Sequence, residues 1–118
     1  MLAHLCGSRF FPDLRNSILF IEETGEETYR IDRMLQQLKL SGALARVSGL
    51  LLGEIDAPAR KRFPPDRRLS AVLHEYLHAL GVPVVSGLRA GHVKSKLTLP
   101  LGGHAELDTA AGRLRFMP

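Results

Sequence analysis

Residues 17–52, SILFIEETGEETYRIDRMLQQLKLSGALARVSGLLL, decide the fold because their hydrophobic pattern changes period twice. The continuous apolar run at 17–21 contains Ile, Leu and Phe and predicts a buried strand. Over 29–40 the apolar residues recur at i, i+3, i+4 and i+7, which predicts an amphipathic helix. A second apolar run at 47–52 predicts another buried strand. The stretch is therefore typical of a strand-helix-strand unit.

The rest of the chain repeats this alternation and then becomes rich in short strands. A second helical stripe covers 69–80 and stops at Gly81, and a strand is expected at 82–86. Three further short strands are expected, the last two as a hairpin around Gly112: 97–101, 105–108 and 113–116. This order predicts one α/β domain over residues 1–118, with a partly parallel sheet and a β-rich C-terminal tail.

The composition excludes several classes of protein. Hydrophobic residues make up 45% and charged residues 24%, which is ordinary for a globular domain. Sixteen Lys and Arg against 12 Asp and Glu give a net charge of +4, too small to indicate a nucleic-acid partner. No apolar run approaches the roughly 20 residues of a membrane helix, and the start of the chain does not resemble a secretory signal. Cys6 has no partner cysteine in this sequence, which favours a cytoplasmic location. In its apolar stretch, Cys6 is interpreted as an unreactive residue that packs against its neighbours.

The segment 55–68 predicts a surface loop. It contains three prolines and five cations, Arg60, Lys61, Arg62, Arg67 and Arg68. One interpretation is a phosphate-binding patch, and the other is a set of solvated loop charges. The second is favoured because Phe63 is the only aromatic residue there that could stack on a ligand.

His74, Glu75 and His78 match the HExxH pattern of zinc peptidases. On a helix, residues i and i+4 share a face, so both imidazoles could bind one zinc ion with Glu75 as general base. A catalytic zinc needs a third protein ligand, but the extended motif has Val84 there, and the downstream carboxylates lie in the expected strand at 105–108. Both histidines also fall on the polar side of the helix. The pattern favours two solvated histidines over a zinc site.

Four segments taken in order resemble a known family: LFIEETGEETYRIDRMLQQLKLSG (19–42), GLLLGE (49–54), LHALGVPVVSGLRAGH (77–92) and KLTLPLGGHAELD (96–108). They resemble the C-terminal domain of the LD-carboxypeptidases, serine peptidases that trim murein tetrapeptide and include the microcin C immunity peptidases. The resemblance implies a swivelling β/β/α type of domain and a cytoplasmic role in murein recycling. It also implies a homodimer, no metal and no organic cofactor.

The resemblance further implies a Ser-His-Glu triad, with its glutamate at Glu22 and its histidine at His92. In that arrangement His92 is the general base, and Glu22 fixes its tautomer and stabilises the imidazolium. The neighbouring Glu23 points to the opposite face of a strand and cannot share the role. Without the resemblance, Glu22 would be interpreted as a solvated strand-end acid and His92 as a turn residue.

In that family the nucleophilic serine belongs to an N-terminal domain. No serine of this sequence lies in a turn such as Gly-x-Ser-x-Gly. We therefore expect the chain to act with an N-terminal serine domain on murein tetrapeptide or a related peptide, and to be inactive alone. The alternatives are a zinc peptidase built on His74 and His78, and a non-catalytic binding domain of the same fold.

Overall fold

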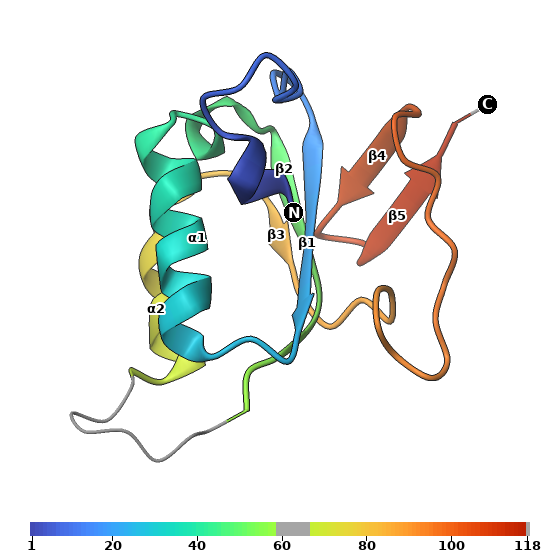
Figure 1. Cartoon of the computed structure of the whole chain (residues 1–118). Coiled ribbons are helices and arrows are strands. Elements are labelled where there is room, and N and C mark those ends of the chain that lie inside the picture. Colours follow the sequence, from blue (N-terminus) through green and yellow to red (C-terminus); the bar gives the residue numbers. More distant parts are fainter. Residues whose placement is uncertain (59–66, 118) are drawn as a thin grey trace.

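A parallel sheet forms the centre of the molecule (Figure 1). The computed structural model describes residues 1–58 and 67–117. Within them, three strands lie in the order β1 (Ile18–Thr24), β2 (Gly49–Asp56) and β3 (Val84–Val85), and both pairs are parallel. The carboxyl ends of all three strands consequently reach one edge of the sheet.

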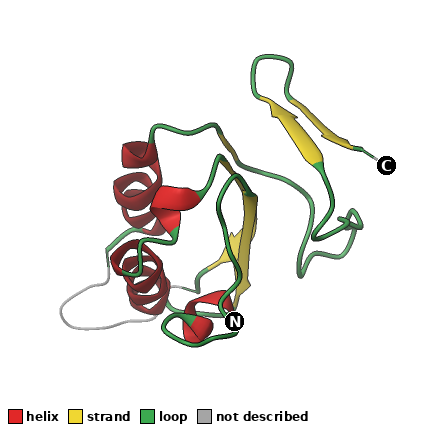
Figure 2. Ribbon diagram, turned by 90° about the horizontal axis from the view of Figure 1, so that it is seen from above, coloured by secondary structure: helices red, strands yellow, loops and turns green. Residues whose placement is uncertain are grey.

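The two faces of the sheet are covered differently. Two helices, α1 (Thr28–Leu40) and α2 (Leu69–Leu77), lie side by side against one face. On the other side lies an antiparallel hairpin of β4 (Ala105–Asp108) and β5 (Arg113–Phe116), as Figure 2 shows from above. This cover on both sides explains why β2 is an almost continuous apolar run, since parallel strands are usually buried on both faces.

Aliphatic side chains from the sheet and the helices form the core between them. Leu50 on β2 and Val72 on α2 are fully buried. The helix α1 contributes Ile31, Leu35 and Leu38, which share one helical face. Burial of such side chains stabilises each position by about 1.5–3 kcal/mol, so this core holds the helices on the sheet.

Short 3₁₀ helices complete the described part of the chain: η1 (Leu2–Leu5), η2 (Leu44–Arg46) and η3 (His78–Leu80). The last of these continues α2 and ends at Gly81, whose φ of 65° is left-handed and suits glycine. In residues 1–58 and 67–117, no helix combines the length and the apolar character needed to cross a membrane.

The α/β class, the parallel sheet and the β-rich tail are confirmed, but several expected elements and boundaries are wrong. The first strand runs on to Thr24, and the strand expected at 82–86 is reduced to Val84–Val85. No strand forms at 97–101, where Pro100 lacks a backbone N–H group and Leu97 donates only to the Arg89 carbonyl (2.7 Å). The helix expected at 69–80 divides into α2 and η3. The second strand continues to Asp56, because the end of β1 pairs with it.

The expected loop at 55–68 is therefore shorter at its start than the sequence indicates. Residues 59–66 lie outside the described residues, so the choice between a phosphate-binding patch and solvated charges stays open. Arg67, at the end of that segment, pairs with Glu75 on α2 (2.5 Å) and lies 3.5 Å from an Asp32 oxygen on α1.

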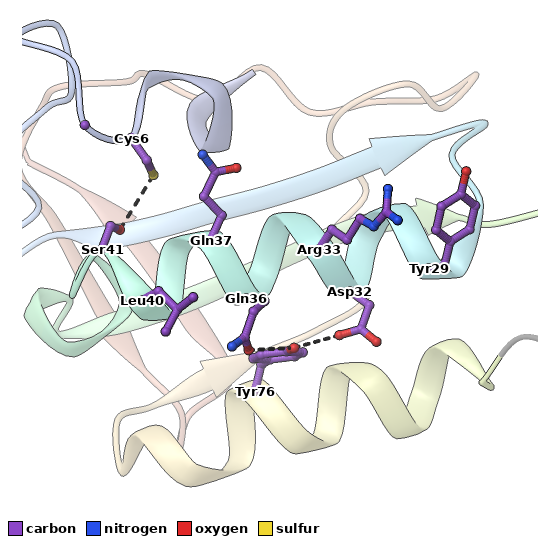
Figure 3. Close-up of a pocket in the computed structure, with 10 residues that line it drawn as sticks. Cys6, Tyr29, Asp32, Arg33, Gln36, Gln37, Leu40, Ser41 and Tyr76 are labelled. Atoms are coloured by element: carbon purple, nitrogen blue, oxygen red, sulfur yellow. Dashed lines mark hydrogen bonds between the residues drawn. The ribbon is translucent and has the colours of Figure 1, made fainter.

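Polar side chains join α1 to α2 beside a shallow groove of about 790 Å³ (Figure 3). The Tyr76 hydroxyl donates to Asp32 Oδ1 at 2.6 Å and lies 3.0 Å from Gln36 Oε1. Cys6, at the far end of the groove, packs against the core and contacts Ser41 Oγ at 3.6 Å. Burial, and next the hydrogen bond to Asp32, raise the pKa of Tyr76 to about 12. The neutral tyrosine is thus part of the helix–helix contact.

Tyr76→Phe is expected to destabilise the fold by about 1.5 kcal/mol at pH 7, because Asp32 loses a donor. The raised pKa of Tyr76 also predicts that the stability of the fold decreases at alkaline pH. The folded state holds the Tyr76 proton more tightly than the unfolded state, so its contribution is complete below pH 10 and is lost as the pH rises towards about 12. Urea unfolding at pH 7 and at pH 11 measures both effects.

Tyr29→Phe is the matched control, since Tyr29 is the other tyrosine of the chain. The difference in the free energy of unfolding between the wild type and Tyr76→Phe should be smaller at pH 11 than at pH 7. Tyr29→Phe keeps Tyr76, so its free energy of unfolding should fall between pH 7 and pH 11 as much as that of the wild type. An equal loss from pH 7 to pH 11 in the wild type and Tyr76→Phe would contradict the assignment.

Candidate active site

Glu22 and His92 meet at the edge of the sheet where the strands end. The Nδ1 atom of His92 lies 2.9 Å from Glu22 Oε2. When Nδ1–H donates to the carboxylate, the Nε2 atom is left free to accept a proton. The Glu22 side chain is 24% exposed and that of His92 is 68% exposed. The imidazole is therefore held by the carboxylate through one nitrogen, while most of its ring is open to solvent.

The end of β1 places the Glu22 carboxylate. Ile21 pairs with Leu52, but Glu23 pairs with Ile55, so the register shifts by one residue at Glu22. Such irregularities redirect a side chain at the end of a strand. The carboxylate of Glu23 accepts from the Thr24 backbone N–H at 2.9 Å and takes no part in the contact with His92.

The segment after β3 places His92. Leu88 N–H donates to the Leu52 carbonyl of β2 at 3.2 Å, which ties this segment to the sheet. Ala90 is buried, its N–H donates to the Leu88 carbonyl at 2.8 Å, and the Arg89 carbonyl accepts from Leu97. These bonds hold the backbone on both sides of His92.

Two glycines make the close approach possible. A Cβ atom on Gly91 would lie 2.6 Å from Glu22 Oε2, and its φ of 97° is itself unfavourable for other residues. A Cβ atom on Gly53 would lie 2.8 Å from the Ala90 carbonyl oxygen and 3.0 Å from Glu22 Cβ. Neither glycine is predicted from the sequence to be part of the site. The only hint in the sequence is that each glycine directly precedes a chemically active side chain, in the dipeptides Gly53-Glu54 and Gly91-His92.

Among the described residues, the HExxH pattern lacks the set of three protein ligands that a catalytic zinc needs. His74 and His78 are exposed, and their rings stack with centroids 4.7 Å apart. Glu75 pairs with Arg67 instead of facing the histidines. Among the residues that the structure describes, no group of three or more His, Cys, Asp or Glu could hold a metal ion. The third ligand required by a zinc peptidase is thus missing from this part of the chain.

Glu22 and His92 form a hydrogen-bonded pair to which the described residues bring no serine hydroxyl. Within residues 1–58 and 67–117, no serine hydroxyl forms a hydrogen bond with His92, and its partner is Glu22. The groove of Figure 3 lies along α1 and α2 and includes neither residue of the pair. This arrangement can accept and return a proton, and it needs a hydroxyl from another segment to act in acyl transfer.

Gly91→Ala should disturb the pair far more than Gly87→Ala. Both glycines have positive φ, but a Cβ on Gly87 would have nothing within 4 Å. The backbone penalty of about 1–2 kcal/mol is common to both. Gly91→Ala adds a clash with the Glu22 carboxylate, for which we expect a further ~1–3 kcal/mol in urea unfolding.

The ring ¹⁵N shifts of His92 give a second measurement. They should change in Gly91→Ala, because Nδ1 loses its acceptor, and stay as in the wild type in Gly87→Ala. Equal stability of the two variants, together with unchanged His92 shifts in both, would show that Gly91 is not needed for the contact.

Comparisons with known proteins agree on one family. Residues 1–107 match the family model described as the LD-carboxypeptidase C-terminal domain. A protein of Synechocystis sp., provisionally named carboxypeptidase slr1534, is 44% identical over 117 residues, which are 97% of this chain and 38% of that protein. The microcin C7 self-immunity protein MccF of Escherichia coli is 34% identical over 111 residues, covering 91% of this chain and 31% of MccF.

Solved structures give the same result. The crystal structure of muramoyltetrapeptide carboxypeptidase from Oxalobacter formigenes has a TM-score of 0.83 and 40% identity, over 98% of this chain and 41% of that one. MccF in complex with aspartyl sulfamoyl adenosine has a TM-score of 0.79 and 30% identity, over 99% and 35%. The chain thus spans about two fifths or less of these relatives. With the fold and the matched residues in agreement, the chain belongs to the LD-carboxypeptidase family and corresponds to its C-terminal domain.

Proposed function

We propose that this chain supplies the histidine and the glutamate of a Ser-His-Glu triad that removes the terminal D-alanine of murein tetrapeptide. The observation that carries the proposal is the 2.9 Å contact between His92 Nδ1 and Glu22 Oε2. This contact supports the proposal because a triad histidine is oriented by a carboxylate through one ring nitrogen and exchanges protons through the other. The names of the relatives, muramoyltetrapeptide carboxypeptidase among them, supply the substrate class.

In the proposed reaction, His92 Nε2 takes the proton of a serine hydroxyl. The serine oxygen attacks the carbonyl carbon of the amide that joins diaminopimelate to D-alanine. The resulting tetrahedral intermediate collapses when the imidazolium of His92 gives its proton to the leaving amine, which releases D-alanine and leaves an acyl-enzyme. Water then replaces the amine, and His92 repeats both transfers in the hydrolysis. Glu22 stays ionised throughout and stabilises the imidazolium.

We propose that the serine and the oxyanion donors come from a domain equivalent to the part of the relatives that lies outside the region matched by this chain. This chain covers 41% of the Oxalobacter carboxypeptidase, so most of that protein lies outside the matched region. A histidine and a glutamate without a nucleophile retain little activity, because triad members act as a unit. We therefore propose that the isolated chain is inactive. The cytoplasmic location and the homodimer implied by the resemblance stay predictions, as does the choice between murein and microcin-type substrates.

A chimaera tests the proposal. The N-terminal portion of the Oxalobacter carboxypeptidase is joined to this chain, and release of D-alanine from murein tetrapeptide is followed by chromatography, with the parent enzyme as positive control. We expect activity in the chimaera and none in the isolated chain. His92→Ala should lower kcat by about 10⁶-fold. Glu22→Gln should lower it by about 10⁴-fold, because the tautomer of His92 is no longer fixed.

Glu23→Gln is the matched control, since it removes the neighbouring carboxylate, which binds only the end of its own strand. Its kcat should stay within about threefold of the unmodified chimaera, a change of roughly 0.6 kcal/mol or less. An active chimaera whose kcat is unchanged by Glu22→Gln or by His92→Ala would contradict the proposed roles. Release of D-alanine by the isolated chain would contradict its dependence on a separate serine.

A further inference from the structure

The histidine pair on α2 is the part of the HExxH pattern that the proposed function leaves unused. His74 lies in α2 and His78 begins η3, one helical turn later. Their ring centroids are 4.7 Å apart and the ring planes differ by 18°. Within residues 1–58 and 67–117, neither ring forms a hydrogen bond or an ion pair, and both side chains are exposed. Two imidazoles are therefore held side by side and open to a ligand from solvent.

The surroundings of the pair favour a metal ion that prefers nitrogen ligands. The histidines border a hollow of about 390 Å³ with a mainly apolar lining, which includes Leu73, Leu77, Val82, Val84 and Ser86. The nearest carboxylate in sequence, Glu75, is held by Arg67 at 2.5 Å. Calcium and magnesium prefer oxygen ligands, whereas imidazole suits zinc, copper and nickel. The described residues thus offer nitrogen without a competing oxygen cluster.

We propose that His74 and His78 form a two-imidazole chelating site for a divalent ion of the late first transition series, such as Ni²⁺, Cu²⁺ or Zn²⁺. This site is separate from Glu22 and His92 and does not depend on their proposed function. With metal–nitrogen bonds of about 2.0–2.1 Å, two cis ligands have nitrogens about 3 Å apart. The rings are 4.7 Å apart at their centroids and nearly parallel, so both side chains must rotate to direct one nitrogen each at a shared ion.

The proposed site differs from that of a zinc peptidase in its number of protein ligands and in having no general base. Two protein ligands leave the remaining coordination positions to water, and Glu75 is engaged elsewhere and cannot act as base for that water. The affinity arises from chelation, because the first imidazole to bind brings the second to a high effective concentration. Loss of either histidine should therefore reduce binding to that of a single imidazole.

Isothermal titration of the untagged 118-residue chain with NiCl₂ at pH 7.5 tests the proposal. We expect one bound ion per chain, with affinity at least tenfold weaker in His74→Ala and in His78→Ala. The double variant should also lose the residual binding of the single imidazole that each single variant keeps at this site. Both positions are exposed on a helix, and alanine is a strong helix former, so the variants should fold.

The matched control keeps the number of histidines and changes only their spacing. In the variant His78→Ala with Ala79→His, the second imidazole moves off the face of the first, and tight binding should be lost. His104→Ala removes a histidine outside the pair and should bind like the wild type. Bound Ni²⁺ should also raise the Tm of the wild type and not that of the spacing variant. No binding by the wild type, or equal affinity in the spacing variant, would overturn the proposal.

Discussion

Parallel pairing of β1 with β2 is the constraint on which the candidate site depends. Because the strands run in one direction, their carboxyl ends reach the same edge of the sheet, where ligands and reactive groups of open α/β sheets gather. Glu22 lies near that end of β1, and the register shift beyond Ile21 sets its direction. The backbone bond from Leu88 to Leu52 brings the segment after β3 to the same edge. Glu22 and His92, 70 residues apart, meet there.

The segment that carries His92 can approach Glu22 closely because glycines stand where the two segments meet. Gly53 and Gly91 are the positions where a Cβ atom would fall within 3.0 Å of Glu22 or of the Ala90 carbonyl. A larger residue at either position would hold the His92 segment away from the sheet, and the hydrogen bond would lengthen beyond its useful range. The contact between Glu22 and His92 therefore depends on the absence of a Cβ atom at Gly53 and Gly91 as much as on the attraction between the two side chains.

The sequence predicts those features that local pattern determines, and it misses those that depend on partners. The helix α1 and the hairpin of β4 and β5 follow from periodicity and turn residues, and both are confirmed. The run at 97–101 has the composition of a strand, but among the described residues it pairs with no strand of either sheet. Conversely, β2 extends to Asp56 because Thr24 pairs with it, which no local pattern shows. The contact of Glu22 with His92 was predicted through the family resemblance, since neither residue is distinctive alone.

The exposure of His92 adds a physical reason to expect that the pair works only when covered. Hydrogen bonds between charged and polar groups are strengthened in a water-excluded site, because solvent no longer screens them. Here the His92 side chain is 68% exposed, so water surrounds most of the imidazole and competes for its protons. In the proposed mechanism, a serine-bearing domain that docks over this edge supplies the nucleophile and also removes that water. The same docking would fix the position of His92 Nε2 relative to the serine, which the hydrogen bond to Glu22 alone leaves free to vary. A nucleophile delivered without a covering surface, such as a short serine peptide, would therefore restore far less activity than the whole domain.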